Sequence, residues 1–474
     1  MQISLFLPEL ILCLMVLFFF FVSLGKPKTK FLENSAILLS SLAVIVSVIT
    51  FKNEGMLFFD AYRIDAFSQV FKIIMTVGLL LVVYLGNNLK GIELELQAEY
   101  YFFLSLSVLG LICMSSSVEL LTILISLEVS SFALYVIIPF RKKQTSRSQM
   151  EAGIKYILFG AASTGITLYG MSYVFGLTHT TYITELYKVI PALLKTNTLI
   201  FIGMIMMLCG FFYKLALFPM HFWAPDVYEG AANETTSFIA TLPKIGAVAL
   251  LIRLVSLSGI DINQLTWIMA AIAVISMTVG NLSALVQNDI KRLLAYSSIA
   301  HAGYVMLGIF SGNDIGYIAS IYYILGYLLM NLACFFVVYH VSNEGENVTF
   351  SSFAGLYKRS PFLSLTLAIG AFGLAGIPPT IGFTGKILLF TAAIKKGFYG
   401  IVVLAVINAG ISAFYYLKMV RAAYFGVDDA SSPIKLHFSA KILGTIVIAT
   451  IILFGVLPER IIEVAKLAIS KIIL

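Results

Sequence analysis

The sequence predicts an all-α polytopic membrane protein of about 14 transmembrane helices, with two inverted five-helix repeats in which helices seven and twelve are broken. Three observations lead to this fold class. Of the 474 residues, 60% are hydrophobic and 12% are charged, and the mean hydropathy is +0.97. Apolar runs of about 20 residues, each able to cross ~30 Å of hydrocarbon, recur from end to end. Two of these runs are interrupted by prolines and glycines.

The predicted crossings follow the apolar runs, and no long polar block is present that would form an extramembrane domain. The run at 3–24 lacks a basic start and a small-residue cleavage site, so we interpret it as a first crossing and not as a signal peptide. The stretch 178–196 is too polar to span the bilayer and is expected at its surface. The predicted crossings are 3–24, 32–51, 66–86, 99–115, 117–138, 150–176, 197–222, 236–257, 264–286, 291–310, 316–340, 361–392, 398–424 and 439–457.

Basic loops set the predicted orientation. With the N-terminus outside, most loop lysines and arginines are cytoplasmic, as the positive-inside rule requires. An even number of crossings then places the C-terminus outside too, and the tail 459–474 has the apolar stripe of a short interfacial helix. These loops account for the net charge of +7 without a nucleic-acid partner. The inner basic residues are Lys26, Lys28, Lys30, Lys90, Arg141, Lys142, Lys143, Arg147, Lys291, Arg292, Lys358, Arg359, Arg421, Lys435 and Lys441.

The first interrupted run reads LCGFFYKLALFPMHFWAPDVYEG at 208–230. Pro219 removes a backbone donor and clashes with the carbonyl one turn earlier, so the helix must kink or break there. The freed backbone groups are tolerated in a membrane only where protein or water surrounds them. Lys214 and His221 lie in the same crossing, and an ammonium at a helix centre costs roughly 2.5–3.5 kcal/mol on insertion. An ion path explains this combination, and a snorkelling Lys214 is the alternative.

The second interrupted run reads GIPPTIGFTGK at 376–386, five crossings after the first. Paired breaks of this kind indicate inverted repeats with an ion path at the breaks. Two unrelated proline kinks are the alternative. An odd number of helices in each repeat gives the two repeats opposite orientations. The predicted divisions are an N-terminal three-helix segment at 1–97, a first repeat at 98–258, a second repeat at 259–426, and a final helix and tail at 427–474.

Two ionisable residues lie deep in predicted crossings. Glu128 is about 15 Å from either end of its helix at a rise of 1.5 Å per residue, so its carboxyl group must be protonated or paired. Lys214 is the leading partner, and a simple interhelix hydrogen bond is the alternative. Lys244 is also at mid-depth. It can release and rebind a proton as a neighbouring charge moves, unless its side chain reaches the surface.

Further candidates follow from position. His301 lies in helix ten, the repeat counterpart of helix five, at a depth resembling that of Glu128. Histidine titrates near neutrality and suits a relay, although a lone histidine is often only a hydrogen-bonding residue. Lys386 is buried near the second break. Lys155 either faces the path or snorkels, and Lys72, which is outside the repeats, is interpreted as structural.

Motifs for bond-making chemistry were not found. The sequence contains no phosphate-cradling glycine loop, no His/Cys metal cluster and no plausible Ser-His-Asp group. We therefore expect neither a metal nor a redox cofactor in this chain. The cysteines are far apart in apolar runs and are interpreted as inert packing residues: Cys13, Cys113, Cys209 and Cys334.

Three motifs carry a resemblance to a known family: YKLALFPMHFWAPDVYEGA at 213–231, IKRLLAYSSIAHAGY at 290–304 and GIPPTIGFTGK at 376–386. The chain resembles the antiporter-like membrane subunits of respiratory complex I over nearly its full length. The DVYEGA ending and Lys386 favour the subunit N group. One departure follows DVYEGA, where the family usually has prolines and this chain has Ala232, Asn233 and Glu234.

The resemblance implies fourteen helices with two inverted repeats. It implies that Glu128 and Lys214 are the paired residues of one half-channel, that Lys244 is the central relay, and that Lys386 ends the other half-channel. It also implies that two histidines connect these sites and that a further lysine matches a family position. The implied proton-translocation residues are Glu128, Lys214, Lys244, His301 and Lys386, with His221 and Lys155 as possible members.

The first functional hypothesis is therefore a proton-translocating membrane subunit of NADH:quinone oxidoreductase. NADH, FMN, Fe–S clusters and quinone would bind partner subunits, which supply the free energy. The expected partners are the other membrane and peripheral subunits and the lipid bilayer, in a bacterial inner membrane with both termini periplasmic. The alternatives are a subunit of a multi-subunit cation/proton antiporter, driven by gradients alone, and a scaffold with fossil charges. The sequence leaves open whether the ion is H⁺ or Na⁺.

Overall fold

The computed structural model describes residues 3–86, 88–142, 148–256, 263–426, 432–470 and 472. These residues are almost entirely helical, with a single two-stranded hairpin among them. The elements are η1 (Ile3–Phe6), α1 (Leu7–Ser23), α2 (Thr29–Ile49), β1 (Gly55–Leu57), β2 (Tyr62–Ile64), α3 (Ala66–Leu85), η2 (Leu94–Leu96), α4 (Gln97–Ser116), α5 (Leu120–Ile137), η3 (Ile138–Phe140), α6 (Ser148–Thr178), α7 (Ile183–Thr196), α8 (Thr198–Leu215), α9 (Trp223–Gly230), α10 (Asn233–Ser256), α11 (Asn263–Leu285), α12 (Ile290–Phe310), α13 (Asp314–Val341), η4 (Ser351–Phe353), α14 (Leu356–Arg359), α15 (Pro361–Ala375), α16 (Ile381–Lys395), α17 (Tyr399–Phe425), α18 (Phe438–Val456) and α19 (Glu459–Ile469).

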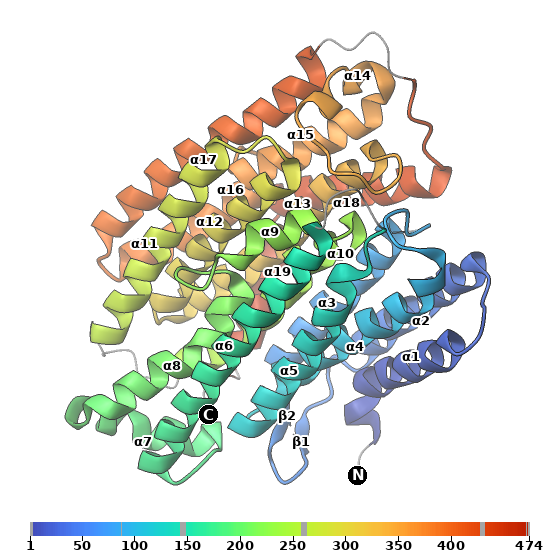
Figure 1. Cartoon of the computed structure of the whole chain (residues 1–474). Coiled ribbons are helices and arrows are strands. Elements are labelled where there is room, and N and C mark those ends of the chain that lie inside the picture. Colours follow the sequence, from blue (N-terminus) through green and yellow to red (C-terminus); the bar gives the residue numbers. More distant parts are fainter. Residues whose placement is uncertain are drawn as a thin grey trace.

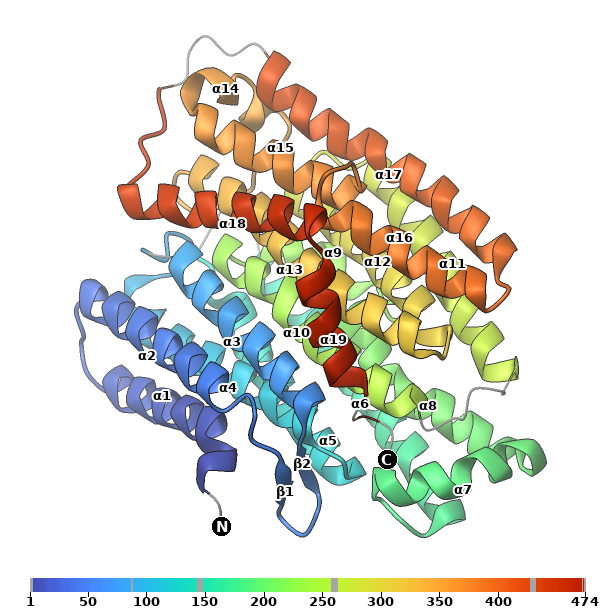
Figure 2. The same cartoon turned by 180° about the vertical axis from the view of Figure 1, so that it is seen from behind.

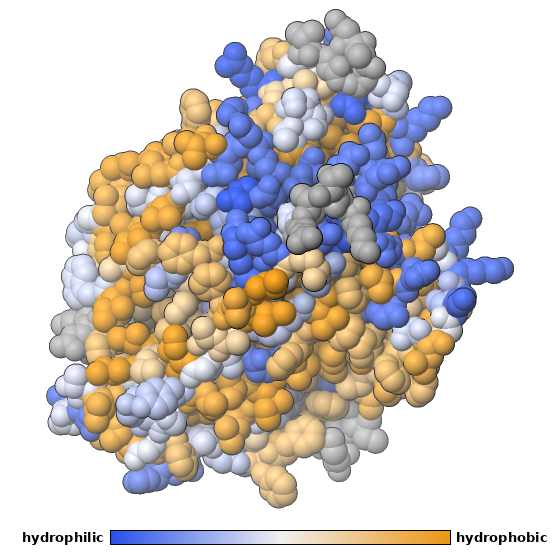
Figure 3. All heavy atoms as spheres, in the orientation of Figure 1, coloured by the Kyte–Doolittle hydropathy of each residue, from blue (hydrophilic) through white to orange (hydrophobic). Residues whose placement is uncertain are grey.

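Within the described residues, 13 helices are long and apolar enough to cross a membrane. The remaining predicted crossing, 361–392, is divided into α15 and α16 at the second proline break. The prediction of an all-α polytopic fold is therefore confirmed, and the broken pair accounts for the fourteenth crossing. The face seen in Figure 3 is apolar over most of its area, and hydrophilic side chains gather in its upper part.

The helices form one tilted bundle (Figures 1 and 2), with α1–α3 on one flank and α11 and α17 on the opposite flank. Between them lies α10, whose membrane-spanning window is completely buried. It packs against α3, α4, α8, α12 and α13. A helix that is enclosed on all sides has no lipid-facing stripe, so each of its polar side chains must contact protein.

The two ends of the bundle carry different contacts. At one end the connections between helices are tied together by Lys90, Arg141 and Lys291, and we call it the basic end. There Arg141 donates to the carbonyl oxygens of Glu229 (2.9 Å) and Gly345 (2.9 Å). Two basic residues used to predict the orientation, at 143 and 147, lie outside the described residues.

The opposite end, which we call the hairpin end, carries strands β1 and β2, which pair antiparallel with Gly55 opposite Ile64. Asp65 follows the hairpin and caps α3 by accepting a hydrogen bond from Ser68 N at 2.8 Å. It also forms an ion pair of 2.7 Å with Arg253 at the end of α10. The hairpin, α3 and α10 are therefore fixed to one another at this end.

Three structural features recur in the two halves of the chain, two of them at a shift of 170 residues. Glu119 caps α5 through Thr122 N, and Asp289 caps α12 through Arg292 N. Each cap also forms an isolated antiparallel bridge, Glu119 with residue 182 and Asp289 with residue 349. A glycine lies against the following helix in the same way in both places. A Cβ at Gly110 would lie 2.6 Å from residue 130 N, and one at position 280 would lie 2.7 Å from residue 300 N.

The polar stretch 178–196, which we expected at the membrane surface, contains α7. Its buried side chains, Ile183, Leu186 and Ile190, follow helical spacing, so one face packs on the bundle. The tail forms α19, which packs against α3 and α13. Ala465, Ala468 and Ile469 are buried there, whereas Val464 and Leu467 are exposed. Protein contacts therefore cover part of α19, and its position at the membrane interface stays a prediction.

A first prediction concerns the close crossing of α4 and α5. Gly110→Ala should destabilise the protein by about 1–3 kcal/mol, because the new Cβ would meet the backbone of Ser126 and Ser130, which cannot move aside. The matched control is Gly165→Ala in α6, where nothing lies within 4 Å. That change should be neutral or stabilising by up to about 1 kcal/mol, since alanine favours helix. Melting temperatures of the two purified variants are compared, and equal values would contradict the close crossing.

Candidate functional site

Both proline breaks end a helix at the same distance from a proline. Helix α8 ends at Leu215, four residues before Pro219, and α15 ends at Ala375, four residues before Pro379. In a continuous helix the N–H of residue i bonds to the carbonyl of residue i−4, and proline has no N–H to offer. Each break therefore leaves buried carbonyl oxygens without their usual donor.

Two lysines supply the missing donors. Lys244 on α10 donates from Nζ to Leu215 O at 2.5 Å. Lys386 on α16 donates to Leu374 O at 3.0 Å and to Ala375 O at 2.8 Å. Both ammonium groups are 4% exposed or less. A cation at the C-terminal end of a helix is also favoured by the helix dipole. Each break is thus capped by a predicted lysine, which comes from the next crossing (α10) at the first break and from the second half of the same crossing (α16) at the second.

Lys214 lies in the last turn of α8, next to the carbonyl that Lys244 binds. Its Nζ donates to Ser130 Oγ on α5 at 3.1 Å. Glu128, also on α5, is half-buried and accepts a hydrogen bond from Thr164 at 2.6 Å. The two charges interact electrostatically. However, the contact of Lys214 is with the serine hydroxyl, so the direct ion pair expected from the sequence is not seen.

His301 on α12 is 2% exposed and lies between two tyrosine hydroxyls. Its Nδ1 is 2.6 Å from Tyr323 OH on α13, and its Nε2 is 3.0 Å from Tyr416 OH on α17. Tyr416 OH also bonds to Ser297 Oγ. Both ring nitrogens therefore have hydroxyl partners that can donate or accept, which suits proton exchange. By the 170-residue shift, Ser298 corresponds to Glu128, so His301 is three residues further along than we expected.

Tyr304 connects His301 with the second break. Its ring lies 5.0 Å from Lys386 Nζ and 5.9 Å from the His301 ring. Its hydroxyl is 3.5 Å from Asn281 Nδ2, and Asn281 also donates to Asn408. Polar groups of α11, α12, α16 and α17 thus meet around the second lysine.

The five principal predicted residues form one series through the bundle. Glu128 interacts electrostatically with Lys214, and Lys244 binds the residue that follows Lys214. His301 interacts electrostatically with both Lys244 and Lys386. The series therefore passes through α5, α8, α10, α12 and α16 and contains both breaks. Such an arrangement can pass a proton between fixed sites inside the bundle.

The two possible members are placed differently. His221 lies within the first break and is 5% exposed, with its ring against Phe218 and Phe222. Its Nδ1 has no hydrogen-bond partner among the described residues. His221 is thus beside the series, next to the break that Lys244 caps. Lys155 is 35% exposed at the basic end, in a cluster of ion pairs, and it does not join the series.

This cluster joins α6, α9 and α12 at the basic end. Lys155 contacts Glu151 (2.6 Å) and Asp226 (2.5 Å), and Arg292 contacts Asp226 (2.6 Å) and Glu229 (2.7 Å). Burial alone would raise the pKa of Asp226, but hydrogen bonds from Lys155 and Arg292 outweigh burial and lower this pKa. The contacts are those of a surface anchor for the short helix α9.

Sequence reasoning missed two buried ion pairs of the described residues, the Asp65–Arg253 pair at the hairpin end and a pair in the N-terminal segment. Glu9 on α1 and Lys72 on α3 are 2.5 Å apart, and both side chains are fully buried. Tyr62 OH also donates to Glu9 Oε1 at 2.5 Å. This supports the structural interpretation of Lys72. The signal was present, since each of the two residues interrupts an apolar run of the N-terminal segment and they carry opposite charges.

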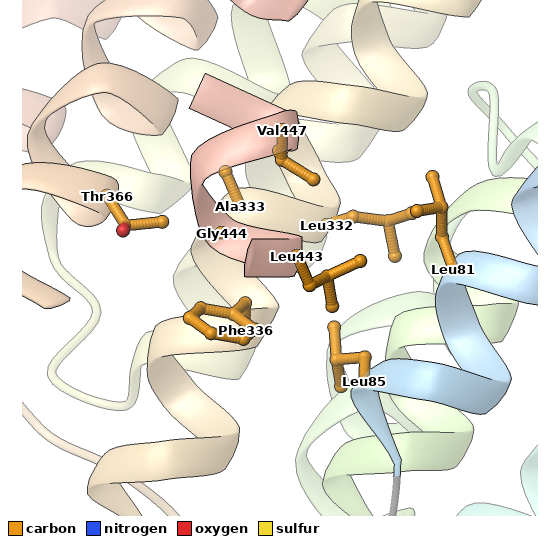
Figure 4. Close-up of a pocket in the computed structure, with 9 residues that line it drawn as sticks. All are labelled: Leu81, Leu85, Leu332, Ala333, Phe336, Thr366, Leu443, Gly444 and Val447. Atoms are coloured by element: carbon orange, nitrogen blue, oxygen red, sulfur yellow. The ribbon is translucent and has the colours of Figure 1, made fainter. Parts of the chain in front are cut away.

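Other features of the described residues do not form a site. Figure 4 shows a crevice of about 10 Å³ between α3, α13, α15 and α18, whose lining is almost wholly aliphatic or aromatic. It presents no ionisable group. No cluster of His, Cys, Asp and Glu that could hold a metal is found in this part of the chain. The four cysteines are free thiols.

The second prediction tests the anchor of α9. Because the pKa of Asp226 is lowered in the folded protein, its carboxylate stabilises the fold above the unfolded pKa of about 4, and this contribution disappears as the pH falls. Asp226→Asn should therefore lower the melting temperature at pH 7, and the difference from the parent should shrink as the pH falls below about 4 and vanish below the lowered pKa of the folded protein. Glu151→Gln, which removes one exposed contact, should have a smaller effect. A difference that does not change with pH would contradict the assignment.

The third prediction concerns the Glu9–Lys72 pair. Lys72→Met should cost about 3–5 kcal/mol, because it leaves a buried carboxylate without its cation. The double variant Glu9→Gln/Lys72→Met should recover much of this loss, because no unpaired charge remains. Melting temperatures of the parent, both single variants and the double variant form a double-mutant cycle. Additive losses would show that the two side chains do not interact.

Comparison with known proteins agrees with this geometry. The family described as "NADH:quinone oxidoreductase/Mrp antiporter, TM" matches residues 117–412. The chain is 45% identical over 469 residues to NADH-quinone oxidoreductase subunit N 2 of Opitutus terrae, covering 98% of each chain. It is 42% identical over 472 residues to the protein of the same name from Solidesulfovibrio magneticus, covering 100% of each.

Solved structures show the same fold. A chain of respiratory complex I from Thermus thermophilus matches with a TM-score of 0.84 and 29% identity, covering 97% of this chain and 99% of that one. A chain of the Mrp complex from a Dietzia species has a TM-score of 0.88 at 18% identity, covering 100% and 98%, which establishes shared fold only. The chain therefore belongs to the family of antiporter-like membrane subunits of NADH:quinone oxidoreductases and Mrp antiporters, within its subunit N group.

Proposed function

We propose that this chain is a proton-translocating membrane subunit of an NADH:quinone oxidoreductase. The observation that carries the proposal is the series of buried ionisable side chains that runs through both helix breaks. Such groups are expensive in a membrane and are retained where ions must pass. The names of the relatives and the 29% identity to a complex I chain place the activity in a redox-driven complex.

The series consists of Glu128, Lys214, Lys244, His301 and Lys386. Lys214 and Lys244 flank the same break, so two ammonium groups there repel each other. When the carboxylate of Glu128 neutralises the charge of Lys214, this repulsion is weak and Lys244 can hold a proton. When Glu128 no longer neutralises Lys214, the repulsion grows and Lys244 releases its proton toward His301 and then Lys386. His221 is a possible side branch at the first break.

The free energy for this transfer comes from elsewhere. A proton moved against 100 mV costs about 2.3 kcal/mol, and the described residues contain no redox centre to supply it. The NADH, FMN, Fe–S clusters and quinone of the proposed complex would be bound by partner subunits. Their signal reaches this chain as a change in the charge or position of Glu128 relative to Lys214.

The proposal includes two inverted repeats, 98–258 and 259–426, preceded by the segment 1–97 and followed by 427–474. The recurrence of the cap and the glycine crossing at a shift of 170 residues supports it, and each capping residue also forms a bridge. Breaks in two oppositely oriented repeats would give the proton path access to opposite sides of the membrane.

The protein is a multi-pass protein of a bacterial inner membrane. We place its basic end in the cytoplasm, because loop lysines and arginines concentrate there. The hairpin end and both termini are then periplasmic. Figures 1 and 2 agree in showing α1 beginning and α19 ending toward the same end of the molecule.

A second candidate is a subunit of a multi-subunit cation/proton antiporter. It is favoured by the likeness to the Mrp chain, which at 18% identity concerns only the fold. Co-purification separates the two candidates. Peripheral NADH-oxidising subunits are expected with the first, and only small membrane partners with the second.

The fourth prediction is that Lys214→Ala and Glu128→Ala each lower proton pumping and the coupled quinone reductase rate. Glu128→Gln should do the same, although its amide can still accept the hydrogen bond from Thr164. This variant separates loss of charge from loss of packing. Pumping is measured by the quenching of a pH-sensitive dye in vesicles that contain the assembled complex.

The control is Lys195→Ala, which removes an exposed lysine at the end of α7 and should leave pumping unchanged. Equal amounts of assembled complex are confirmed for every variant by immunoblotting of the purified membranes. Normal pumping in both Lys214→Ala and Glu128→Ala would refute the role of the pair.

A further inference from the structure

One buried carboxylate is not used by the series described above. Glu234 is at the start of α10 and is 1% exposed. Its Oε1 accepts a hydrogen bond from Gly91 N at 3.0 Å. Its Oε2 is buried without a hydrogen-bond partner among the described residues. A buried carboxylate oxygen in this state is costly, so it needs an explanation.

A polar stripe leads from this carboxylate along α10. Glu234, Ser237, Thr241 and Lys244 follow one another at spacings of three, four and three residues, which keeps them within an arc of roughly 80° on the helix. All four side chains are buried. Ser237 Oγ donates to Glu234 O at 2.7 Å, and Thr241 Oγ1 donates to Ser237 O at 2.7 Å. Each hydroxyl oxygen retains lone pairs that can accept a proton-bearing partner.

The stripe spans roughly 15 Å, from the basic end to the lysine at the first break. The remaining positions between Glu234 and Lys244 on this face offer no other titratable side chain. Lys244 already donates to Leu215 O, so it marks the inner end of the stripe. The stripe therefore connects the surface region with the middle of the proposed proton series.

The surroundings of Glu234 are strongly polar. It interacts electrostatically with Lys90 and Lys291, and three tyrosines and Arg141 interact with it in turn. The loops at Gly91 and Gly345 cover Glu234 and contact each other. The charged and titratable groups that face Glu234 are Lys90 from the α3–α4 connection, Tyr100 and Tyr101 from α4, Arg141 after α5, Lys291 from α12 and Tyr339 from α13.

The loops that cover Glu234 lie next to solvent-exposed residues. Lys90 is partly exposed and donates to Ser342 O at 3.3 Å, and the neighbouring residues 343 and 344 are exposed. Asn233, which precedes the carboxylate, donates to Glu346 O at 3.4 Å. A single layer of loops therefore separates Glu234 from the surface of the basic end, and Lys90 lies beside Glu234.

We propose that Glu234 is a proton-collecting carboxylate, which takes protons from the basic end and passes them along the hydroxyl stripe of α10 to Lys244. In the first step a proton leaves surface water and binds Glu234 Oε2, which neutralises the carboxylate. In the second step the carboxylic acid returns to carboxylate and the neutral Lys244 amine becomes ammonium. One proton moves and no other bond changes. The inference rests on the proposed function of Lys244.

The experiment uses the assembled complex in vesicles. Glu234→Gln keeps an oxygen that can accept the Gly91 hydrogen bond but cannot carry a proton. It should lower the pumping rate by about tenfold or more, since a positioned proton-transfer group typically contributes at least about 100-fold and buffer can replace part of it. The loss should be larger at alkaline pH, where protons are scarce, and Glu234→Asp should restore most of the rate.

A second variant interrupts the stripe without touching the carboxylate. Thr241→Val removes one hydroxyl at nearly constant volume and should also slow pumping. Its matched control is Thr366→Val, which removes a buried hydroxyl on α15 that has the same bond to a carbonyl four residues back. Glu344→Gln, an exposed carboxylate of the same end, is the control for Glu234→Gln. Both control variants should pump normally.

The outcomes distinguish this inference from the function on which it rests. Normal pumping with an unchanged pH profile in Glu234→Gln and Thr241→Val, together with loss in Lys244→Ala, would overturn the collecting role and leave the proposed function standing. Normal pumping in Lys244→Ala would overturn both. If Glu234→Gln does not assemble, Thr241→Val decides, and normal pumping in that variant would overturn the proposal.

Discussion

The rest of this structure depends on one constraint: a carbonyl oxygen inside a membrane must have a hydrogen-bond donor. At both breaks a proline cannot supply the N–H that the carbonyl four residues earlier would receive, and a lysine from another helix supplies it. The lysines therefore have a structural role as well as a chemical one. A neutral amine still has two N–H bonds, so Lys244 and Lys386 can lose a proton and continue to satisfy the same oxygens. This is the property required of a relay group that must also maintain the fold.

The buried charges of this chain are of two kinds. Glu9 and Lys72 are in direct contact, fully enclosed and balanced within the N-terminal segment. The charges of the series are separated by hydroxyl groups, rings and broken backbone, and no one of them has a single dedicated counter-ion. Direct pairing holds two charges in place, because separating them exposes each to an environment that cannot solvate it. Indirect pairing leaves charges free to change, which is why the proposed proton path and the N-terminal ion pair have such different surroundings.

Much of this architecture could be predicted from the sequence, because its signals are local. Apolar runs fix the crossings, and Pro219 and Pro379 fix where two of them break. The identities of the buried ionisable residues are also visible in the sequence. Their partners are not, since they depend on the packing of helices that are distant in the chain. The bond of Lys214 to Ser130, and the tyrosines around His301, could be found only in the folded protein. His301 is three residues beyond the position that a shift of 170 residues from Glu128 gives, and periodicity alone does not fix such a shift.

The complete enclosure of α10 has a consequence for biogenesis. Three polar residues of α10 bond to other parts of the chain. Glu234 bonds to the α3–α4 connection, Lys244 bonds to the end of α8, and Arg253 bonds to Asp65, which caps α3. When α10 leaves the translocon, a central lysine alone opposes its transfer into lipid by roughly 2.5–3.5 kcal/mol. These hydrogen bonds all come from segments that are synthesised earlier, whereas α12 and α13, which also enclose α10, are synthesised later. The hydrogen-bond partners of α10 are thus already in the membrane when α10 is inserted. A circular permutation that places α10 before them should impair insertion more than it impairs the finished fold.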